Sequence, residues 1–355
     1  MASIMDKAKN AVGMKTEDRT HTIVGGKIHD TGYGIMRLTW QSKPPSQEES
    51  FSCMRTALDM GANFWNGGEI YGNAERNSLH LLKEYFDKYP GDTNKVVISI
   101  KGGCNKDSLV PNGSADNVRR SIDECLTVMD NKKLDLFECA RVDPKTPIEI
   151  TVRAAEEYVK AGKLGGISLS ECSANTIRRA AKVATISAVE VEFSIWETTI
   201  FDNGVAKACA ELDIPIVAYS PLGRGFLTGQ IKSANDIAED DFRKHLPRFS
   251  EENFPKNLQL VEQLQQLADK KDCTTGQIGL AWVRAQSQRN GNPVIIPIPG
   301  ASSVDRVKEN FTEVKLSEND VKEIDSIIAS VQVEGDRYGG PMAQLSFGDS
   351  AELNE

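Results

Sequence analysis

A tyrosine and a lysine follow two short apolar runs of the chain, and together they could deliver a proton to a carbonyl group. Tyr71 comes after the run 62–66, and Lys101 directly follows the run 95–100. A tyrosine ordinarily has a pKa near 10, and a cation within a few ångströms lowers that pKa by favouring phenolate. The pair is therefore a candidate general acid for a carbonyl that receives hydride. The alternatives are a core tyrosine at a turn and a lysine that reaches water.

Two later stretches could hold a nucleotide. In the segment 219–225, Tyr219 could stack on a planar heterocycle, and the backbone N–H groups of the Ser- and Gly-containing loop could hold pyrophosphate. The segment 299–310 follows another apolar run and opens a helix, on which Arg306 suits a phosphate. The alternatives are an ordinary turn and a solvated charged helix face.

These residues need a scaffold of strands with catalytic loops at one end. Amphipathic helical patterns separate eight short apolar runs, and this alternation favours parallel strands joined by right-handed crossovers. We therefore predict an α/β fold, a (β/α)8 TIM barrel. A doubly wound sheet is the rival, but no G-x-G-x-x-G motif follows its first strand. The predicted strands are 32–38, 62–66, 95–100, 134–139, 165–170, 188–193, 214–219 and 294–298.

The remaining segments suggest additions to a single barrel. We expect a mobile leader over 1–20, the barrel over 21–332 and a C-terminal tail over 333–355 that either covers the barrel mouth or is disordered. A long loop without clear periodicity spans 221–257, after the seventh strand, where barrels often bind phosphates.

Composition excludes several classes of function. The net charge of −9 argues against binding to nucleic acid or to an anionic membrane surface. The seven scattered cysteines form no CxxC pair, and the four histidines lack metal-ligand spacing, so we expect a reducing compartment and no metal. We expect the N-terminal stretch to be neither a secretory signal nor a membrane anchor. We expect a cytoplasmic location, with the nucleus as a second compartment.

In combination, the motifs resemble those of the aldo-keto reductase family, in order, over roughly residues 25–328. The resemblance rests on Gly61-x-Asn-Phe-x-x-x-x-Glu-x-Tyr-Gly72, Asp135-Leu-Phe, Ser170-Glu171, Tyr219-Ser-Pro-Leu222 and Pro297-x-Pro-Gly300 through Arg306-x-x-Glu-Asn310. It implies a NADPH-dependent oxidoreductase with Tyr71 as general acid and Lys101 tuning it. It also implies that Tyr219 stacks on nicotinamide, that Ser170 binds its carboxamide, and that Arg306 and Asn310 contact the adenosine end. The full set of implied cofactor contacts is Ser170, Glu190, Tyr219, Ser220, Leu222, Arg224, Gly300, Ser302, Arg306, Glu309 and Asn310.

The chain departs from the family pattern at catalytic positions. The aspartate that pairs with the lysine is Asn66 here, so we expect Lys101 to lack a charged partner and to act more fully on Tyr71. The histidine after strand four falls on Ala140, which leaves Arg141 as the adjacent candidate for polarising a carbonyl. An ion pair of Arg141 with Asp143 is the alternative. The usual glutamine on strand six is Glu190, and Ser168 replaces a glycine.

Segments 137–144 and 169–173 resemble the fungal pyridoxal reductase branch of this family. That resemblance implies pyridoxal as the small-molecule aldehyde substrate, reduced reversibly to pyridoxine, with Trp40, Trp65 and Trp196 as candidates for stacking on its ring. Two alternatives stay open. One is a cofactor-binding regulatory subunit, like the potassium-channel β subunits, and the other is a broad-range aldehyde or ketone reductase. The sequence does not indicate an oligomeric state.

Overall fold

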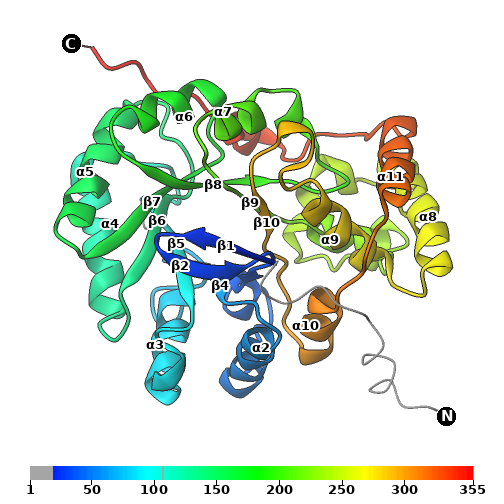
Figure 1. The fold of residues 1–355 in the computed structure, drawn as a ribbon, viewed down its shortest axis with the longest axis horizontal. Coiled ribbons are helices and arrows are strands. Elements are labelled where there is room, and N and C mark those ends of the chain that lie inside the picture. The colour runs from blue at the N-terminus through cyan, green and yellow to red at the C-terminus, as the bar shows by residue number, and fades with distance from the viewer. Residues whose placement is uncertain (1–18, 106–107, 355) are drawn as a thin grey trace.

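The chain forms a barrel of eight parallel strands surrounded by helices (Figure 1). The computed structural model describes residues 19–105 and 108–354, so most of the predicted leader lies outside the described residues. Neighbouring strands pair in the order β10 to β3, and Gly34 N donates to Pro299 O at 3.2 Å to join the first strand to the last. The eight strands are β3 (Tyr33–Gly34), β4 (Phe64–Gly68), β5 (Val97–Gly102), β6 (Leu134–Cys139), β7 (Leu164–Ser170), β8 (Ile186–Glu192), β9 (Ile216–Tyr219) and β10 (Ile295–Pro297).

All eight predicted strands are present, and the barrel prediction is confirmed. The first strand is shorter than predicted, because Ile35 leaves the extended conformation (φ −93°, ψ 2°) and the 3₁₀ helix η3 (Met36–Leu38) follows. The helices on the outside are α2 (Gln47–Asp59), α3 (Ser78–Lys88), α4 (Ala115–Val128), α5 (Ile148–Lys160), α6 (Ala174–Ala181), α7 (Val205–Glu211), α8 (Phe254–Lys270), α9 (Thr275–Ala285), α10 (Val304–Phe311) and α11 (Glu318–Ser330).

A β-hairpin that was not predicted closes the end of the barrel at which the strands begin. Its strands β1 (Thr20–Ile23) and β2 (Gly26–His29) pair antiparallel, and a turn with positive φ at Val24 and Gly25 joins them. Ile23 and Ile28 pack into the barrel interior against a ring of residues from the strands, including Phe64, Val97, Leu136, Val217 and Ile296. Figure 1 shows the hairpin over the centre of the barrel.

The segment predicted as a long loop over 221–257 is built of short helical turns. It contains η6 (Gly223–Thr228), η7 (Ala234–Asp236), η8 (Phe242–His245) and η9 (Pro247–Phe249), and α8 already begins at Phe254. Phe226 stacks on Trp196 with ring centroids 4.0 Å apart, and Phe249 and Phe254 pack against Phe226. This aromatic cluster anchors the segment to the loop after β8.

The tail after α11 packs across the end of the barrel at which β7, β8 and β9 finish. Gly348 N donates to Glu171 O at 2.7 Å, and the Ser350 hydroxyl accepts from Ile148 N at the start of α5. In Figure 1 the red C-terminal segment runs from α11 to α6, and it contains the 3₁₀ helix η11 (Gly340–Leu345). Within the described residues, the tail is thus an ordered cover on one side of the mouth. Across residues 19–105 and 108–354, no helix has the length and apolar character needed to cross a membrane.

Candidate active site

The polar groups of the site come from strand positions that point into the barrel. Side chains alternate across a strand, so Phe64 in the barrel interior puts Asn66 on the same face. In the same way, Leu136 places Glu138 inward and Ala188 places Glu190 inward. These polar residues lie at the carboxyl ends of the strands, where (β/α)8 barrels carry their catalytic groups.

Lys101 lies among carboxylates at this end of the barrel. Its Nζ is 2.9 Å from Glu138 Oε1 and also forms an ion pair with Glu190 Oε1. Asn66 Nδ2 donates to Glu190 Oε2 at 2.7 Å. The expectation that Lys101 lacks a charged partner is therefore wrong. Two glutamates from β6 and β8 supply the charge that Asn66 cannot.

Burial and charge act on this group together. Burial alone would lower the pKa of Lys101, but Glu138 and Glu190 outweigh it and hold that pKa above its usual value. The pKa of Glu190 is well above its usual value because burial and the neighbouring Glu138 outweigh the attraction of Lys101. Glu190 was expected on the cofactor, but in this arrangement both of its carboxylate oxygens have partners within the protein.

Tyr71 lies beside this cluster, on the loop after β4. Its phenol ring stacks on Trp40 with centroids 5.4 Å apart and planes 25° apart, and its backbone oxygen accepts from the Thr39 hydroxyl at 2.7 Å. A Cβ at Gly68 would lie 3.1 Å from the tyrosine ring, so that position suits glycine. The local sequence thus leaves room for the ring and fixes its orientation.

Burial raises the pKa of Tyr71 to about 12, although Lys101 and Arg141 both act to lower it. The expectation that Lys101 brings this pKa down is therefore wrong for the net shift. The reason is that burial and the carboxylates Glu190 and Glu138 oppose the two cations. Tyr71 consequently keeps its proton at neutral pH, as an acid must before it donates.

Arg141 extends into the mouth and does not pair with Asp143. Its Nη2 donates to the Tyr338 hydroxyl at 3.3 Å, and its guanidinium lies 5.8 Å from the centre of the same ring. Asp143 instead accepts from Gly113 N and from the Thr146 hydroxyl. The alternative of an ion pair with Asp143 is therefore not the arrangement in the structure, and Arg141 Nη1 donates instead to Ala140 O at 2.6 Å.

Ser170 is the last residue of β7, and Tyr219 is the last residue of β9. The Ser170 hydroxyl is buried and has no hydrogen-bond partner within the described part of the chain. A buried hydroxyl without a partner is costly, so this atom fits a site for a polar ligand group such as a carboxamide. The Tyr219 hydroxyl donates to Glu171 Oε1 at 2.9 Å and lies 3.0 Å from the Tyr338 hydroxyl.

The loop after β9 holds the next predicted contacts. Ser220 and Arg224 adopt positive φ (48° and 58°), and Leu222 is nearly buried. The Arg224 guanidinium is 2.7 Å from Glu192 Oε2, and it lies over the Tyr338 ring at 4.4 Å. This arginine is thus already bound to β8 and to the tail.

The predicted contacts after β10 lie on α10 and on the loop that precedes it. Gly300 bridges to Gly34, and Asn310 Nδ2 lies 3.5 Å from Gly300 O. Arg306 Nη1 is 2.6 Å from Glu309 Oε2, with over a third of the arginine side chain exposed. Ser302 lies next to Ser303, which caps the helix. The segment therefore presents a cation next to a helix N-terminus, which is an arrangement suited to phosphate.

Among the three tryptophans proposed to stack on the substrate, only Trp40 lies where it could contact one. It is 41% exposed and stacks on Tyr71, whereas Trp65 and Trp196 are buried among other aromatic rings. Trp65 and Trp196 are therefore core residues.

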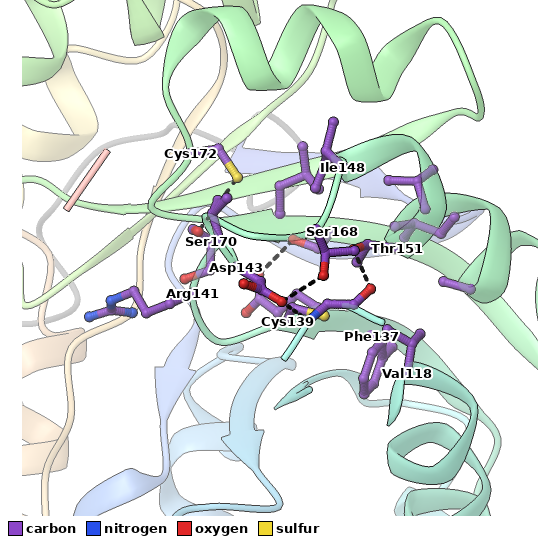
Figure 2. Close-up of a pocket in the computed structure, with 18 residues that line it drawn as sticks. Val118, Phe137, Cys139, Arg141, Asp143, Ile148, Thr151, Ser168, Ser170 and Cys172 are labelled. Atoms are coloured by element: carbon purple, nitrogen blue, oxygen red, sulfur yellow. Dashed lines mark hydrogen bonds between the residues drawn. The ribbon is translucent and has the colours of Figure 1, made fainter. Parts of the chain in front are cut away.

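Figure 2 shows a small pocket between β6, β7 and α5, lined by Ile148, Thr151 and Ser168 among others. Its cavity volume is about 20 Å³, which is room for about one water molecule. In the figure the Arg141 side chain points away from these residues. The pocket lies behind the strands and is too small for an aldehyde or a nucleotide. No group of residues in the described ranges has the composition and placement of a metal site.

Sequence reasoning missed Glu138, Arg337 and Tyr338. Strand alternation from Leu136 could have placed Glu138 inward, and a buried charge next to Lys101 would have followed. No sequence signal places Arg337, which is 8% exposed and meets Glu171, Glu192 and Glu197 at 2.8, 3.4 and 3.7 Å. Its contacts depend on where the tail folds.

Tyr71, Lys101 and the buried Ser170 hydroxyl, which has no hydrogen-bond partner in the described residues, all lie toward the carboxyl end of the barrel strands. The chain belongs to the aldo/keto reductase family, whose model matches residues 31–329. Members of this family are oxidoreductases that use a nicotinamide cofactor, and this chain is one of them.

Its relatives include fungal proteins that it matches over most of their length. It is 38% identical to "Probable pyridoxal reductase 2" of Schizosaccharomyces pombe, over 88% of this chain and 96% of the relative. It is 39% identical to "Aldo-keto reductase yakc" of the same organism, whose name adds NADP(+), over 94% and 98%. The fold resembles the solved glycerol dehydrogenase AKR11B4 of Gluconobacter oxydans, with a TM-score of 0.77, 21% identity, and coverage of 88% and 96%.

Proposed function

We propose that the protein reduces pyridoxal to pyridoxine with NADPH, reversibly, and that Tyr71 is the general acid. The observation that carries the proposal is the position of Tyr71 beside the buried Lys101 at the carboxyl end of the barrel. With its pKa raised to about 12, the phenol is protonated at neutral pH, which a general acid requires.

Several residues of the mouth are suited to the cofactor. A bound reduced nicotinamide supplies the hydride. Ser170 would accept or donate a hydrogen bond to the carboxamide, since its buried hydroxyl has no other partner in the described residues. Tyr219 would lie against the nicotinamide ring, and Arg306 would face the 2′-phosphate, which favours NADPH over NADH.

Arg141 takes the part that a histidine plays in the family pattern. Its cation lowers the pKa of Tyr71 and reaches Tyr338, so it lies close to the oxygen that gains negative charge. A fixed cation at that place stabilises a developing alkoxide. Trp40, stacked on Tyr71 and partly exposed, offers a flat surface to an aromatic aldehyde.

Pyridoxal suits such a site because it is flat and polar. Its ring hydroxyl lies ortho to the aldehyde and could itself donate a hydrogen bond to the developing alkoxide, next to Arg141. The similarity to a protein described as a pyridoxal reductase supports the choice of substrate. On sequence grounds, we propose a cytoplasmic location.

The test is to replace Tyr71 with Phe and to follow NADPH absorbance with pyridoxal. Loss of turnover of about 10²- to 10⁴-fold, with NADPH binding nearly intact, is expected for a general acid. Tyr89→Phe, at the C-terminal end of α3 outside the barrel, is the matched control. Retained activity in Tyr71→Phe would sink the assignment.

A panel of aldehydes and ketones tests the substrate. The proposal expects pyridoxal to have the highest kcat/KM of the panel. Similar values across the panel would instead support a broad-range reductase. Tight NADPH binding without turnover of any member would support a regulatory subunit.

A further inference from the structure

Glu190 connects two strands to Lys101 in a way that gives it a role in positioning. One carboxylate oxygen forms an ion pair with Lys101 from β5, and the other accepts from Asn66 of β4 at 2.7 Å. The exposed fractions of Lys101, Glu190 and Asn66 are 3%, 2% and 4%. Water therefore screens these contacts little, and their geometry is fixed by the strands.

A second carboxylate completes the group. Glu138 lies directly opposite Lys101 in the register of β5 and β6, with Oε1 2.9 Å from the ammonium nitrogen. The Ser168 hydroxyl donates to the other oxygen of Glu138 at 2.9 Å. Two buried glutamates facing one lysine favour a shared proton, because two ionised carboxylates would leave an uncompensated buried charge.

We propose that Glu190 is a positioning residue that directs the Lys101 ammonium at Tyr71, the role that the aspartate expected at position 66 has in the family pattern. Asn66 then holds Glu190 and has no direct part in the proton chemistry. The departures from the family pattern at positions 66 and 190 are then linked. The carboxylate expected on β4 stands on β8 as Glu190, and the amide expected on β8 stands on β4 as Asn66. Glu190 is therefore not a cofactor contact. The inference rests on the proposed function, since it assumes that Tyr71 is the acid.

The charged groups that act on Tyr71 are Lys101 and Arg141, which favour phenolate, and Glu190 and Glu138, which oppose it. Replacing Glu190 with Gln removes one opposing carboxylate and frees Lys101 to move. We expect kcat for pyridoxal reduction to fall about 10- to 100-fold, because small misplacements of a catalytic group cost that much. KM and the Kd of NADPH should stay nearly constant. The alkaline limb of the pH profile should move to lower pH, because the phenol loses its proton more easily.

The decisive experiment compares Glu190→Gln with the double variant Asn66→Asp/Glu190→Gln. The double variant again has one carboxylate and one amide at these positions, so it should recover kcat and the alkaline limb to within a few-fold of the unmodified protein. Glu157→Gln, an exposed glutamate on α5 outside the barrel, is the control and should leave kcat and the alkaline limb in place. Circular dichroism and thermal unfolding establish that each variant is folded.

Two results would overturn the proposal. One is a folded double variant that stays as slow as Glu190→Gln, since the carboxylate would then have no positioning role that position 66 can replace. The other is a Glu190→Gln variant with unchanged kcat and weakened NADPH binding, which would make Glu190 a cofactor contact. Tyr71→Phe separates this from the wider proposal: if Tyr71→Phe stays active, the acid is misassigned whatever the Glu190 variants do.

Discussion

Arg337 Nη2 lies 2.8 Å from Glu171 Oε2, and this buried pair joins the C-terminal tail to the residue that follows Ser170. Glu171 also accepts from the Tyr219 hydroxyl, so the pair links the tail to two of the predicted cofactor contacts. Arg337 keeps the pKa of Glu171 below its usual value even though burial acts to raise it. The tail is thus fastened to the mouth by charge as well as by backbone contacts.

Replacing Arg337 with Met should destabilise the protein strongly. The change leaves Glu171 buried without its cation, and removing one partner of a buried ion pair costs about 3–5 kcal/mol. Urea unfolding monitored by circular dichroism measures the loss. Arg178→Met is the matched control, since its pair with Glu211 is about 40% exposed and its loss should change the stability little. Equal losses for the two variants would contradict a buried role for Arg337.

Ser170→Ala should separate cofactor binding from folding. Because the buried hydroxyl has no partner in the described residues, its removal should leave the stability of the cofactor-free protein unchanged or slightly higher. The Kd of NADPH should rise about tenfold through loss of one hydrogen bond of about 1.4 kcal/mol. Isothermal titration calorimetry and thermal unfolding measure the two effects. Ser168→Ala, which breaks a bond to Glu138, should show the reverse pattern.

Arg306→Ala should weaken NADPH binding and spare NADH. Its guanidinium is partly exposed, and within the described residues it pairs with Glu309 on the next turn of α10, so it could turn to a phosphate. Loss of one charge-assisted contact of about 1.5–3 kcal/mol corresponds to a Kd about 10- to 100-fold higher. Fluorescence titration with both cofactors checks this. An equal effect on NADH would place Arg306 away from the 2′-phosphate.

Trp40→Leu should slow the reaction without unfolding the protein. The indole is partly exposed and stacks on Tyr71, and an aromatic pair contributes about 0.5–1.5 kcal/mol, so kcat/KM should fall about 2- to 10-fold. Trp65→Leu should lower the thermal stability and change kcat/KM little. Trp65 is fully buried next to Tyr85 and Phe86, and its loss leaves a cavity. Steady-state kinetics and thermal unfolding of both variants are the measurements.

The pH dependence should differ between the two directions of the reaction. Reduction needs the protonated phenol, and oxidation needs the deprotonated form. With the pKa of Tyr71 raised to about 12, reduction should lose no activity to this group up to about pH 10, and oxidation should rise about tenfold per pH unit from 7 to 10. Profiles of kcat/KM against pH check both. A fall of reduction near pH 8 with an apparent pKa of 8 would mean that Tyr71 titrates far lower.

The barrel could be predicted from the sequence because each strand carries its own signal. The runs 95–100 and 134–139 are apolar, short and followed by helical patterns, and the structure has strands β5 and β6 there. The hairpin over Thr20–His29 has only four-residue strands, and its turn at Val24 and Gly25 gives a weak local signal. The hairpin is stabilised by packing on the open end of the barrel, and local sequence patterns carry no information about that long-range contact.

Sequence patterns could place Tyr71 and Lys101 near strand ends, but they did not indicate the partners of Lys101. Tyr71 and Lys101 stand at strand ends and carry a motif, whereas the ion pair of Lys101 with Glu190 joins β5 to β8 across the barrel. Such a contact depends on barrel closure, on the parity of each strand and on the rotamers of both side chains. The net pKa of Tyr71 was misjudged for the same reason, since its burial and the nearby carboxylates appear only in the folded chain.

The hairpin over the opposite end of the barrel has a kinetic consequence. Ile23 and Ile28 pack into that end of the barrel, so we expect ligands to reach the catalytic groups from the opposite end, on which the tail packs. Two ligands that enter from the same side restrict each other's access to the site. The one seated deeper has to arrive first and depart last, so the reaction should follow a compulsory order of addition and release, with product inhibition patterns that reveal which ligand leads.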